Sequence, residues 1–114
     1  MRLQLCDYTG AMPLMKRPDA LRLNEKQIKQ LELLRGDNAF DHYPPAAKRD
    51  AVDGVVVIDM LLNAEGQVLE AEVASEAPAG FGFGLAALDT AKTFEFRNTF
   101  RRSVLLTWQF EFLP

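Results

Sequence analysis

The side chains that could carry out nucleophilic or metal chemistry are few and scattered along this sequence. His42 is the only histidine, and no second histidine or cysteine lies at metal-ligand spacing from it. Ser75 and Ser103 have no basic residue placed to activate them as nucleophiles. The sequence therefore predicts neither a metal site nor a serine or cysteine nucleophile, and His42 is expected to be an ordinary solvated side chain.

Acidic residues offer the next candidate chemistry, because two close carboxylates can act as general acid and base. The candidates are Asp50 with Asp53, and Glu70, Glu72 and Glu76. Charges at these spacings on the outer face of a hairpin are more often solubilising. We therefore expect no catalytic carboxylate pair.

A glycine-rich segment, Gly80-Phe-Gly-Phe-Gly84, could in principle cradle a phosphate. No Lys-Ser or Lys-Thr pair follows it, and a loop precedes it. We interpret it as a hinge and helix start with Phe81 or Phe83 in the core. No enzyme activity and no cofactor are predicted, so the function is sought in a binding surface.

Composition narrows the class of protein further. The chain has 114 residues, 48% of them hydrophobic and 25% charged, which suits one domain with one core. A net charge of −3 makes nucleic acid an unexpected partner. Cys6 is the single cysteine, so no intrachain disulfide can form. No apolar run approaches the roughly 20 residues of a membrane helix, and Met1–Cys6 lacks the apolar core of a signal peptide. We expect a cytosolic protein or a soluble piece of a longer, anchored one.

The stretch Ser103–Leu113 alternates with a period of two, which is typical of a β-strand. One face carries Leu106, Trp108, Phe110 and Phe112, and the other carries Leu105, Thr107, Gln109 and Glu111. We expect the first set to be buried and the second set to be exposed. A strand at the end of the chain is often an edge strand, which offers unpaired backbone groups to an extended peptide.

Helices and turns are predicted by capping and by glycine. Asn24 is a good N-cap with Gln27 three residues later, and the stripe of Ile28, Leu31 and Leu34 predicts a helix over 24–35. A short helix is expected from Pro44 to Ala51, and a longer one over 84–94. Residues 63–66 form a hairpin turn in which Gly66 takes a positive φ.

The hairpin turn joins two predicted strands, 55–63 and 67–75, and the change of parity between Val68 and Ala71 predicts a bulge. The order predicts an α+β fold, with a three-stranded antiparallel sheet (hairpin, helix, last strand) and helices packed on one face. The second face of the first strand carries Val55, Val57 and Leu61. We expect residues 1–42, or a strand-exchanged dimer, to cover that face.

Several motifs from Tyr43 onward occur in a familiar order: Tyr43-Pro-Pro-Ala-Ala-Lys48, Asp53-Gly-Val-Val-Val57, Ala64-Glu-Gly-Gln-Val68, Ala86-Ala-Leu88 with Phe94-Glu-Phe96, and Trp108-Gln-Phe-Glu-Phe112. Over about 70 residues this order resembles the C-terminal domain of the TonB energy-transducer family. Phe94 stands where that family usually has tryptophan. The resemblance divides the chain into an N-terminal extension, 1–42, with its helix near 24–35, and a TonB C-terminal-like domain, 43–114.

The resemblance implies a non-enzymatic, periplasmic domain that takes up the TonB-box peptide of an outer-membrane receptor as an added strand beside its last strand. The implied peptide-binding residues are Leu105, Thr107, Gln109, Glu111, Arg101 and Arg102, with the arginines meeting acidic residues that flank the box. Implied partners are the receptor, an inner-membrane motor complex if the full protein carries an anchor, and a second copy in a homodimer. The alternative is an envelope module with the same fold that has a structural or regulatory role without energy transduction.

Overall fold

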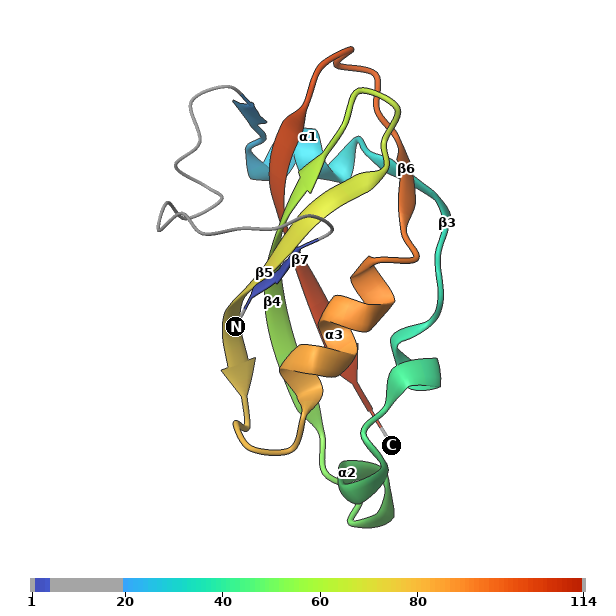
Figure 1. The fold of residues 1–114 in the computed structure, drawn as a ribbon, viewed down its shortest axis with the longest axis vertical. Coiled ribbons are helices and arrows are strands. Elements are labelled where there is room, and N and C mark those ends of the chain that lie inside the picture. The colour runs from blue at the N-terminus through green and yellow to red at the C-terminus, as the bar shows by residue number, and fades with distance from the viewer. Residues whose placement is uncertain (1, 5–19, 114) are drawn as a thin grey trace.

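The central feature of the fold is a five-stranded sheet (Figure 1). The computed structural model describes residues 2–4 and 20–113, so Cys6 lies outside the described residues. All neighbouring strands pair antiparallel except β2, which runs parallel to β7. The strands, in sheet order, are β1 (Arg2–Gln4), β5 (Val68–Ala77), β4 (Gly54–Leu62), β7 (Val104–Phe112) and β2 (Leu21–Arg22). The three central strands are the predicted antiparallel sheet, so the α+β fold is confirmed.

The β4–β5 hairpin has the predicted turn and the predicted bulge. Leu62 pairs with Val68, whereas Leu61 pairs with Glu70, so Leu69 is the extra residue on β5. Gly66 has a φ of 88°, and a Cβ built on it would lie 1.8 Å from the carbonyl oxygen of Phe96. The turn therefore depends on glycine for two reasons, its backbone conformation and the close approach of a second chain segment.

Replacing Gly66 with valine is expected to cost about 3 kcal/mol or more of unfolding free energy, since backbone strain of about 1–3 kcal/mol adds to the clash. Ala64→Val is the matched control, because Ala64 is exposed in the same turn, and it should change stability by about 0.5 kcal/mol. Denaturant melts of the two variants test this turn. Equal midpoints would contradict the turn geometry.

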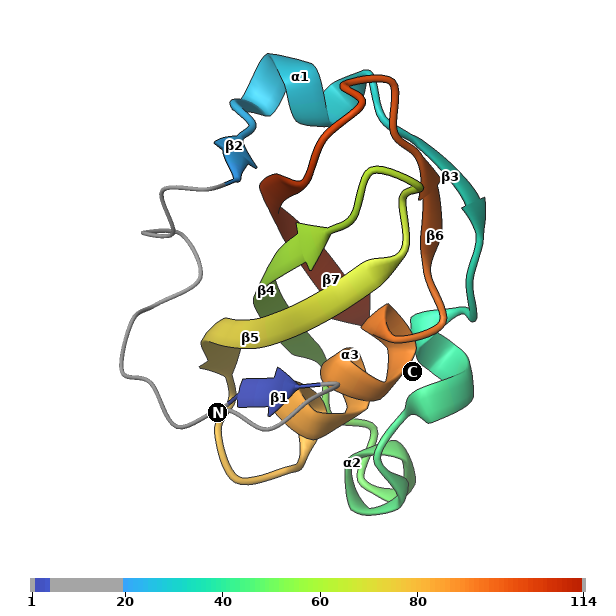
Figure 2. The ribbon, with the colours of Figure 1, turned by 45° about the horizontal axis from the view of Figure 1, so that its top comes forward.

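Helix α3 (Phe83–Ala91) lies across one face of the sheet and covers the core there (Figure 2). The face beneath it carries the predicted apolar alternation, with Val56, Ile58, Met60 and Leu62 buried on β4. Phe83 also sits deep in the core, and Phe81 is half-buried beside it. The glycine-rich segment is thus the start of a helix, as the sequence indicates.

An aromatic cluster joins the start of α3 to the end of β7. The rings of Tyr43, Phe83 and Phe112 lie with centroids 5.2–5.8 Å apart. The Tyr43 hydroxyl donates a hydrogen bond to the carbonyl oxygen of Val52. Burial, and secondly the Asp53 carboxylate, raise the pKa of Tyr43 above its ordinary value. The neutral hydroxyl is therefore the form that the fold favours, and this contribution is lost only as the pH rises above about 10.

The helix predicted over 24–35 is mostly wrong. Its start is confirmed, because Asn24 and Gln27 form a capping box, but α1 (Glu25–Lys29) ends after five residues. The next residues form β3 (Glu32–Arg35), which pairs antiparallel with β6 (Glu95–Arg97). Backbone pairing with this distant segment, supported by an Arg97–Glu32 ion pair at 2.8 Å, overrides the local helical pattern.

Among the described residues, the second face of the sheet is covered only in part. Leu23, Ile28 and Leu31 pack into the main core on the α3 side rather than on the opposite face. On that opposite face Leu61 and Leu105 are buried, with Ala20 beside them, and Val55 remains 40% exposed. Of residues 1–42, the 24–35 segment therefore does not cover this face, whereas Ala20 packs beside Leu61 and Leu105. Cover by a strand-exchanged dimer stays a prediction.

Two short helical segments precede β4. The 3₁₀ turn η2 (Ala39–His42) is followed by α2 (Pro45–Arg49), which is the predicted short helix. Glu70 on β5 is buried rather than solvated, and Glu72 and Glu76 are half-buried. Among the described residues, no helix has the length and apolarity needed to cross a membrane.

Candidate functional site

Within residues 2–4 and 20–113, the outer edge of β7 is paired at its beginning only, by β2. The N–H of Leu21 donates to the carbonyl oxygen of Ser103 at 3.0 Å, and the N–H of Leu23 donates to that of Leu105 at 2.8 Å. The chain then leaves the sheet, because Asn24 caps α1. As far as the structure describes the chain, the predicted edge strand is thus an edge strand only beyond Leu105.

The direction of the backbone groups along the remainder of β7 follows from these two bonds. In a strand, the N–H and C=O of one residue point to the same side, and successive residues alternate. Because Ser103 and Leu105 point toward β2, Thr107, Gln109 and Glu111 point outward as well. β7 pairs with β4 without a register shift, so this alternation continues to the end of the strand. In the part of the chain that the structure describes, no strand pairs with these outward groups.

Three of the predicted site residues, Thr107, Gln109 and Glu111, are exposed. The Thr107 hydroxyl donates to Asp59 Oδ1 at 2.8 Å, and Gln109 Nε2 donates to Glu111 Oε1 at 3.1 Å. These side-chain contacts run along one sheet face and leave the backbone edge open. The free edge, defined as the outward backbone of Thr107, Gln109 and Glu111, is the candidate site.

Leu105 is not part of this exposed surface. Its side chain is 0% exposed, packed with Leu61 in the small cluster that Ala20 borders. Its carbonyl oxygen is already bonded to Leu23. The expectation that Leu105 is exposed is wrong because Ala20, far away in the sequence, helps to cover it.

Arg101 and Arg102 are exposed, but they lie before the covered part of β7. At about 3.3 Å per residue, roughly 16 Å of chain separates Arg102 from Thr107. The carbonyl oxygen of Arg102 accepts a hydrogen bond from Asn98 Nδ2 at 2.8 Å, which anchors this loop. Along β7, the two arginines thus lie beyond the beginning of β2, and the free edge lies beyond its end.

A hollow of about 370 Å³ lies where β2 ends and the free edge begins. Its apolar lining comes from Leu23, Ile28 and Val57, and its polar lining comes from Arg22, Glu25, Thr107 and Gln109. The sequence did not predict that the N-terminal segment contributes to this site through Arg22, Leu23, Glu25 and Ile28. The Asn24 cap predicts where a helix begins, but no local pattern shows that the preceding residues pair with β7.

Aromatic side chains support the free edge from the core side. The half-buried Trp108 ring meets Phe94 and Phe96 edge to face, with centroids 6.1 and 5.2 Å away. The ring of Phe94 packs against Gly36. A Cβ atom built on Gly36 would lie only 2.3 Å from a ring carbon of Phe94. Phe94, which the resemblance places at a usual tryptophan position, is therefore a packing residue beneath β7.

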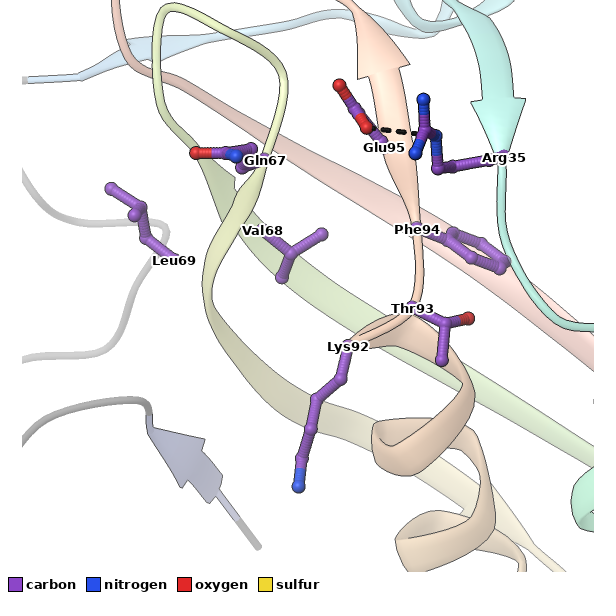
Figure 3. A pocket seen from close by; sticks show the side chains of 8 residues that line it. All are labelled: Arg35, Gln67, Val68, Leu69, Lys92, Thr93, Phe94 and Glu95. Atoms are coloured by element: carbon purple, nitrogen blue, oxygen red, sulfur yellow. Dashed lines mark ion pairs between the residues drawn. The ribbon is translucent and has the colours of Figure 1, made fainter.

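Another hollow, of about 350 Å³, lies at the far end of α3 (Figure 3). Val68, Leu69 and Phe94 supply its apolar lining, while Arg35 and Glu95 form an ion pair at 3.1 Å beside it. The side chain of Lys92 extends away from that pair (Figure 3) and lies 3.7 Å from Asp89. These charges are paired locally, so the hollow gathers no set of groups for catalysis.

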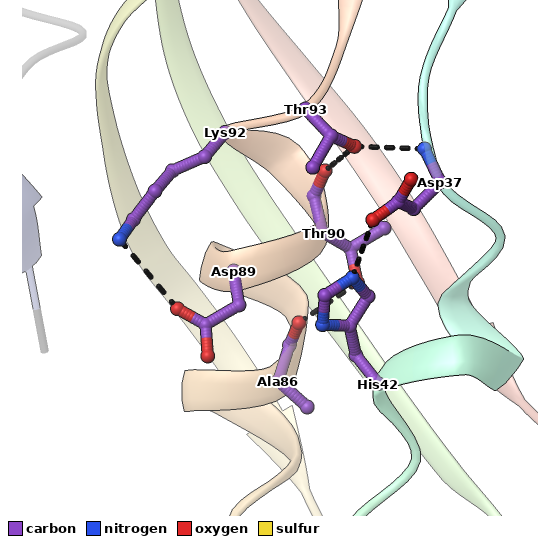
Figure 4. A network of polar contacts seen from close by, with 7 residues as sticks. All are labelled: Asp37, His42, Ala86, Asp89, Thr90, Lys92 and Thr93. Atoms are coloured by element: carbon purple, nitrogen blue, oxygen red, sulfur yellow. Dashed lines mark hydrogen bonds and ion pairs between the residues drawn. The ribbon is translucent and has the colours of Figure 1, made fainter.

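The only histidine takes part in a polar network that ties the chain before η2 to α3 (Figure 4). His42 Nε2 lies 2.9 Å from Asp37 Oδ2, and the N–H of Asp37 donates to Thr93 Oγ1 at 2.7 Å. That hydroxyl in turn donates to the carbonyl oxygen of Thr90 at 2.7 Å. His42 is therefore half-buried and partnered rather than simply solvated, and the network holds structure together without presenting a free nucleophile.

Comparison with known proteins assigns the family. The model of the family described as "Gram-negative bacterial TonB protein C-terminal" matches residues 40–112. The chain belongs to this family. Among solved structures, the TonB C-terminal domain of Pseudomonas aeruginosa, determined in solution by NMR, matches with a TM-score of 0.58 and 18% identity, over 82% of this chain and 92% of that one. No curated protein sequence matches. The TonB-type fold is thus established, and residues 20–39 precede the residues that the family model matches.

Proposed function

We propose that this TonB C-terminal domain is a protein-interaction domain that docks the TonB-box peptide of an outer-membrane receptor as an added strand on the free edge. The periplasm is the compartment that this function requires. Coupling to an inner-membrane motor complex would let the docked domain act in energy-dependent uptake. The observation that carries the proposal is the run of outward backbone groups at Thr107, Gln109 and Glu111 without a strand partner in the described structure.

Strand addition suits this edge physically. The edge belongs to the central sheet, and β4 on its other side holds it in a continuous register from Gly54 to Leu62. An added strand gains main-chain hydrogen bonds at a net value of about 0.5–1.5 kcal/mol each. The peptide must be ordered on binding, which offsets much of that gain. We therefore expect a dissociation constant on the order of micromolar.

The charges near the edge favour a peptide without a strong negative charge. Glu111 and Asp59 lie on the exposed face beside the edge, where Asp59 holds the Thr107 hydroxyl. The part of β7 that pairs with β2 separates Arg101 and Arg102 from the edge. We therefore expect neither arginine to contact the docked peptide. The peptide-binding residues in this proposal are Thr107, Gln109 and Glu111, acting mainly through the backbone.

Titration calorimetry with a synthetic TonB-box peptide tests this function. The matched control is the same peptide with N-methyl groups on alternate residues, in one or the other phase. We expect one phase to weaken binding by about tenfold or more, because it removes donors that face β7, and the other phase to be nearly neutral. Equal binding of all three peptides would show that the domain does not bind by strand addition.

A further inference from the structure

The free edge begins at the hollow beside α1. Along β7, this hollow lies directly after the residues that pair with β2. β2 occupies the outer side of β7 up to the bond between the N–H of Leu23 and the carbonyl oxygen of Leu105. The next outward residue, Thr107, lines the hollow, as does Gln109. A docked strand would therefore start where β2 stops, with its first paired residue at this hollow.

The lining of the hollow comes from both sides of the sheet edge. Leu23 and Ile28 belong to the core on the α3 side, with Leu23 buried and Ile28 half-buried. Val57 lies on the opposite face, since its neighbours Val56 and Ile58 are buried under α3. The hollow thus straddles the edge, and a side chain on a strand added there would meet apolar groups.

The polar residues at the hollow are balanced in charge. Arg22 and Glu25 contribute one charge of each sign, and Thr107 and Gln109 contribute neutral groups. A charged peptide side chain would meet a like charge as well as an opposite one, while an apolar side chain would meet Leu23, Ile28 and Val57. The volume of about 370 Å³ is ample for one aliphatic or aromatic side chain.

We propose that this hollow is a specificity pocket that accepts one apolar side chain of the docked peptide, and that β2 and α1 thereby fix the register of the added strand. The inference rests on the proposed docking function and adds its specificity. Residues 22–28 precede the family match, which begins at residue 40. The pocket is therefore built partly from a segment that lies before the residues matched by the family model.

A double-mutant cycle between protein and peptide tests the pocket. Each residue of the TonB-box peptide is replaced in turn by alanine, and binding is measured by calorimetry. With the native protein, alanine at one apolar position of the peptide should weaken binding by about tenfold. The loss of a few methylene contacts in an apolar pocket lowers affinity by about this factor. Ile28→Ala should reduce this difference to about threefold or less.

Two further variants keep the test decisive. Val57→Ala truncates the pocket lining that β4 supplies. It should also reduce the loss of affinity caused by alanine at the sensitive peptide position, even if Ile28→Ala unfolds α1. Lys29→Ala is the matched control, because Lys29 is exposed on α1 and does not line the pocket, so the tenfold difference should persist. Circular dichroism monitors the fold of each variant.

The outcomes separate the pocket from the docking function. If the peptide binds and its sensitive position keeps a tenfold difference in both the Ile28→Ala and Val57→Ala proteins, the pocket inference is overturned while strand addition stands. The same holds if no peptide position is sensitive. If no peptide binds the native protein, the docking function is overturned, and the pocket inference with it.

Discussion

Proline at Gln109 is expected to abolish peptide binding while leaving the domain folded. The N–H of Gln109 points to the free edge, so proline removes a donor for the peptide without breaking the β4–β7 ladder. Gln109→Ala is the matched control: it removes the exposed side chain but keeps the N–H, and should change affinity by about threefold or less. Calorimetry measures binding, and circular dichroism measures folding.

The same substitution at the neighbouring residue should have the opposite effect. The N–H of Trp108 points toward β4, so Trp108→Pro removes a ladder bond inside the sheet and should cost about 3 kcal/mol or more beyond the loss of its side chain. Trp108→Ala separates the two losses, because it keeps the N–H and removes only the half-buried ring. If Trp108→Pro folds and Gln109→Pro does not, the backbone directions assigned to β7 are wrong.

The second large effect is expected in the aromatic cluster. Phe83→Ala should lower the unfolding free energy by about 3–5 kcal/mol, because the ring is fully buried and touches Tyr43, Phe112 and the backbone at Gly54. Leu85→Ala is the control on the same helix, since Leu85 is 52% exposed, and should cost about 0.5 kcal/mol. Denaturant melts measure both variants. Equal losses would contradict the placement of α3 on the sheet.

Local patterns predicted those parts of this fold that depend on neighbouring residues. The alternation from Ser103 to Leu113 correctly placed Leu106, Phe110 and Phe112 in the core, whereas Trp108, which was expected to be buried, is half-buried. The turn at Gly66 has the expected backbone. The bulge at Leu69 also followed from the change of parity along β5. In each case the burial or the turn depends on spacing within a few residues, which the sequence displays directly.

Pairings between distant segments could not be predicted in this way. Glu32–Arg35 carries a helical pattern, yet it forms a strand because Glu95–Arg97 lies beside it. Leu105 lies on the same face of β7 as the exposed Thr107 and Gln109, yet it is buried because Ala20 and Leu61 help to cover it. The pocket beside the free edge depends on the pairing of β2 with β7, which no local spacing reveals. The candidate site was therefore predicted along β7 and missed where the N-terminal segment meets it.

Amide hydrogen exchange, followed by NMR with and without a TonB-box peptide, tests strand addition at the free edge most directly. The amides of Trp108 and Phe110 point toward β4 and should exchange slowly in both states. The amides of Thr107, Gln109 and Glu111 should exchange rapidly in the free protein and become protected by about tenfold or more when the peptide binds. Protection that appears along α3, with these three amides unchanged, would contradict docking at the edge of β7.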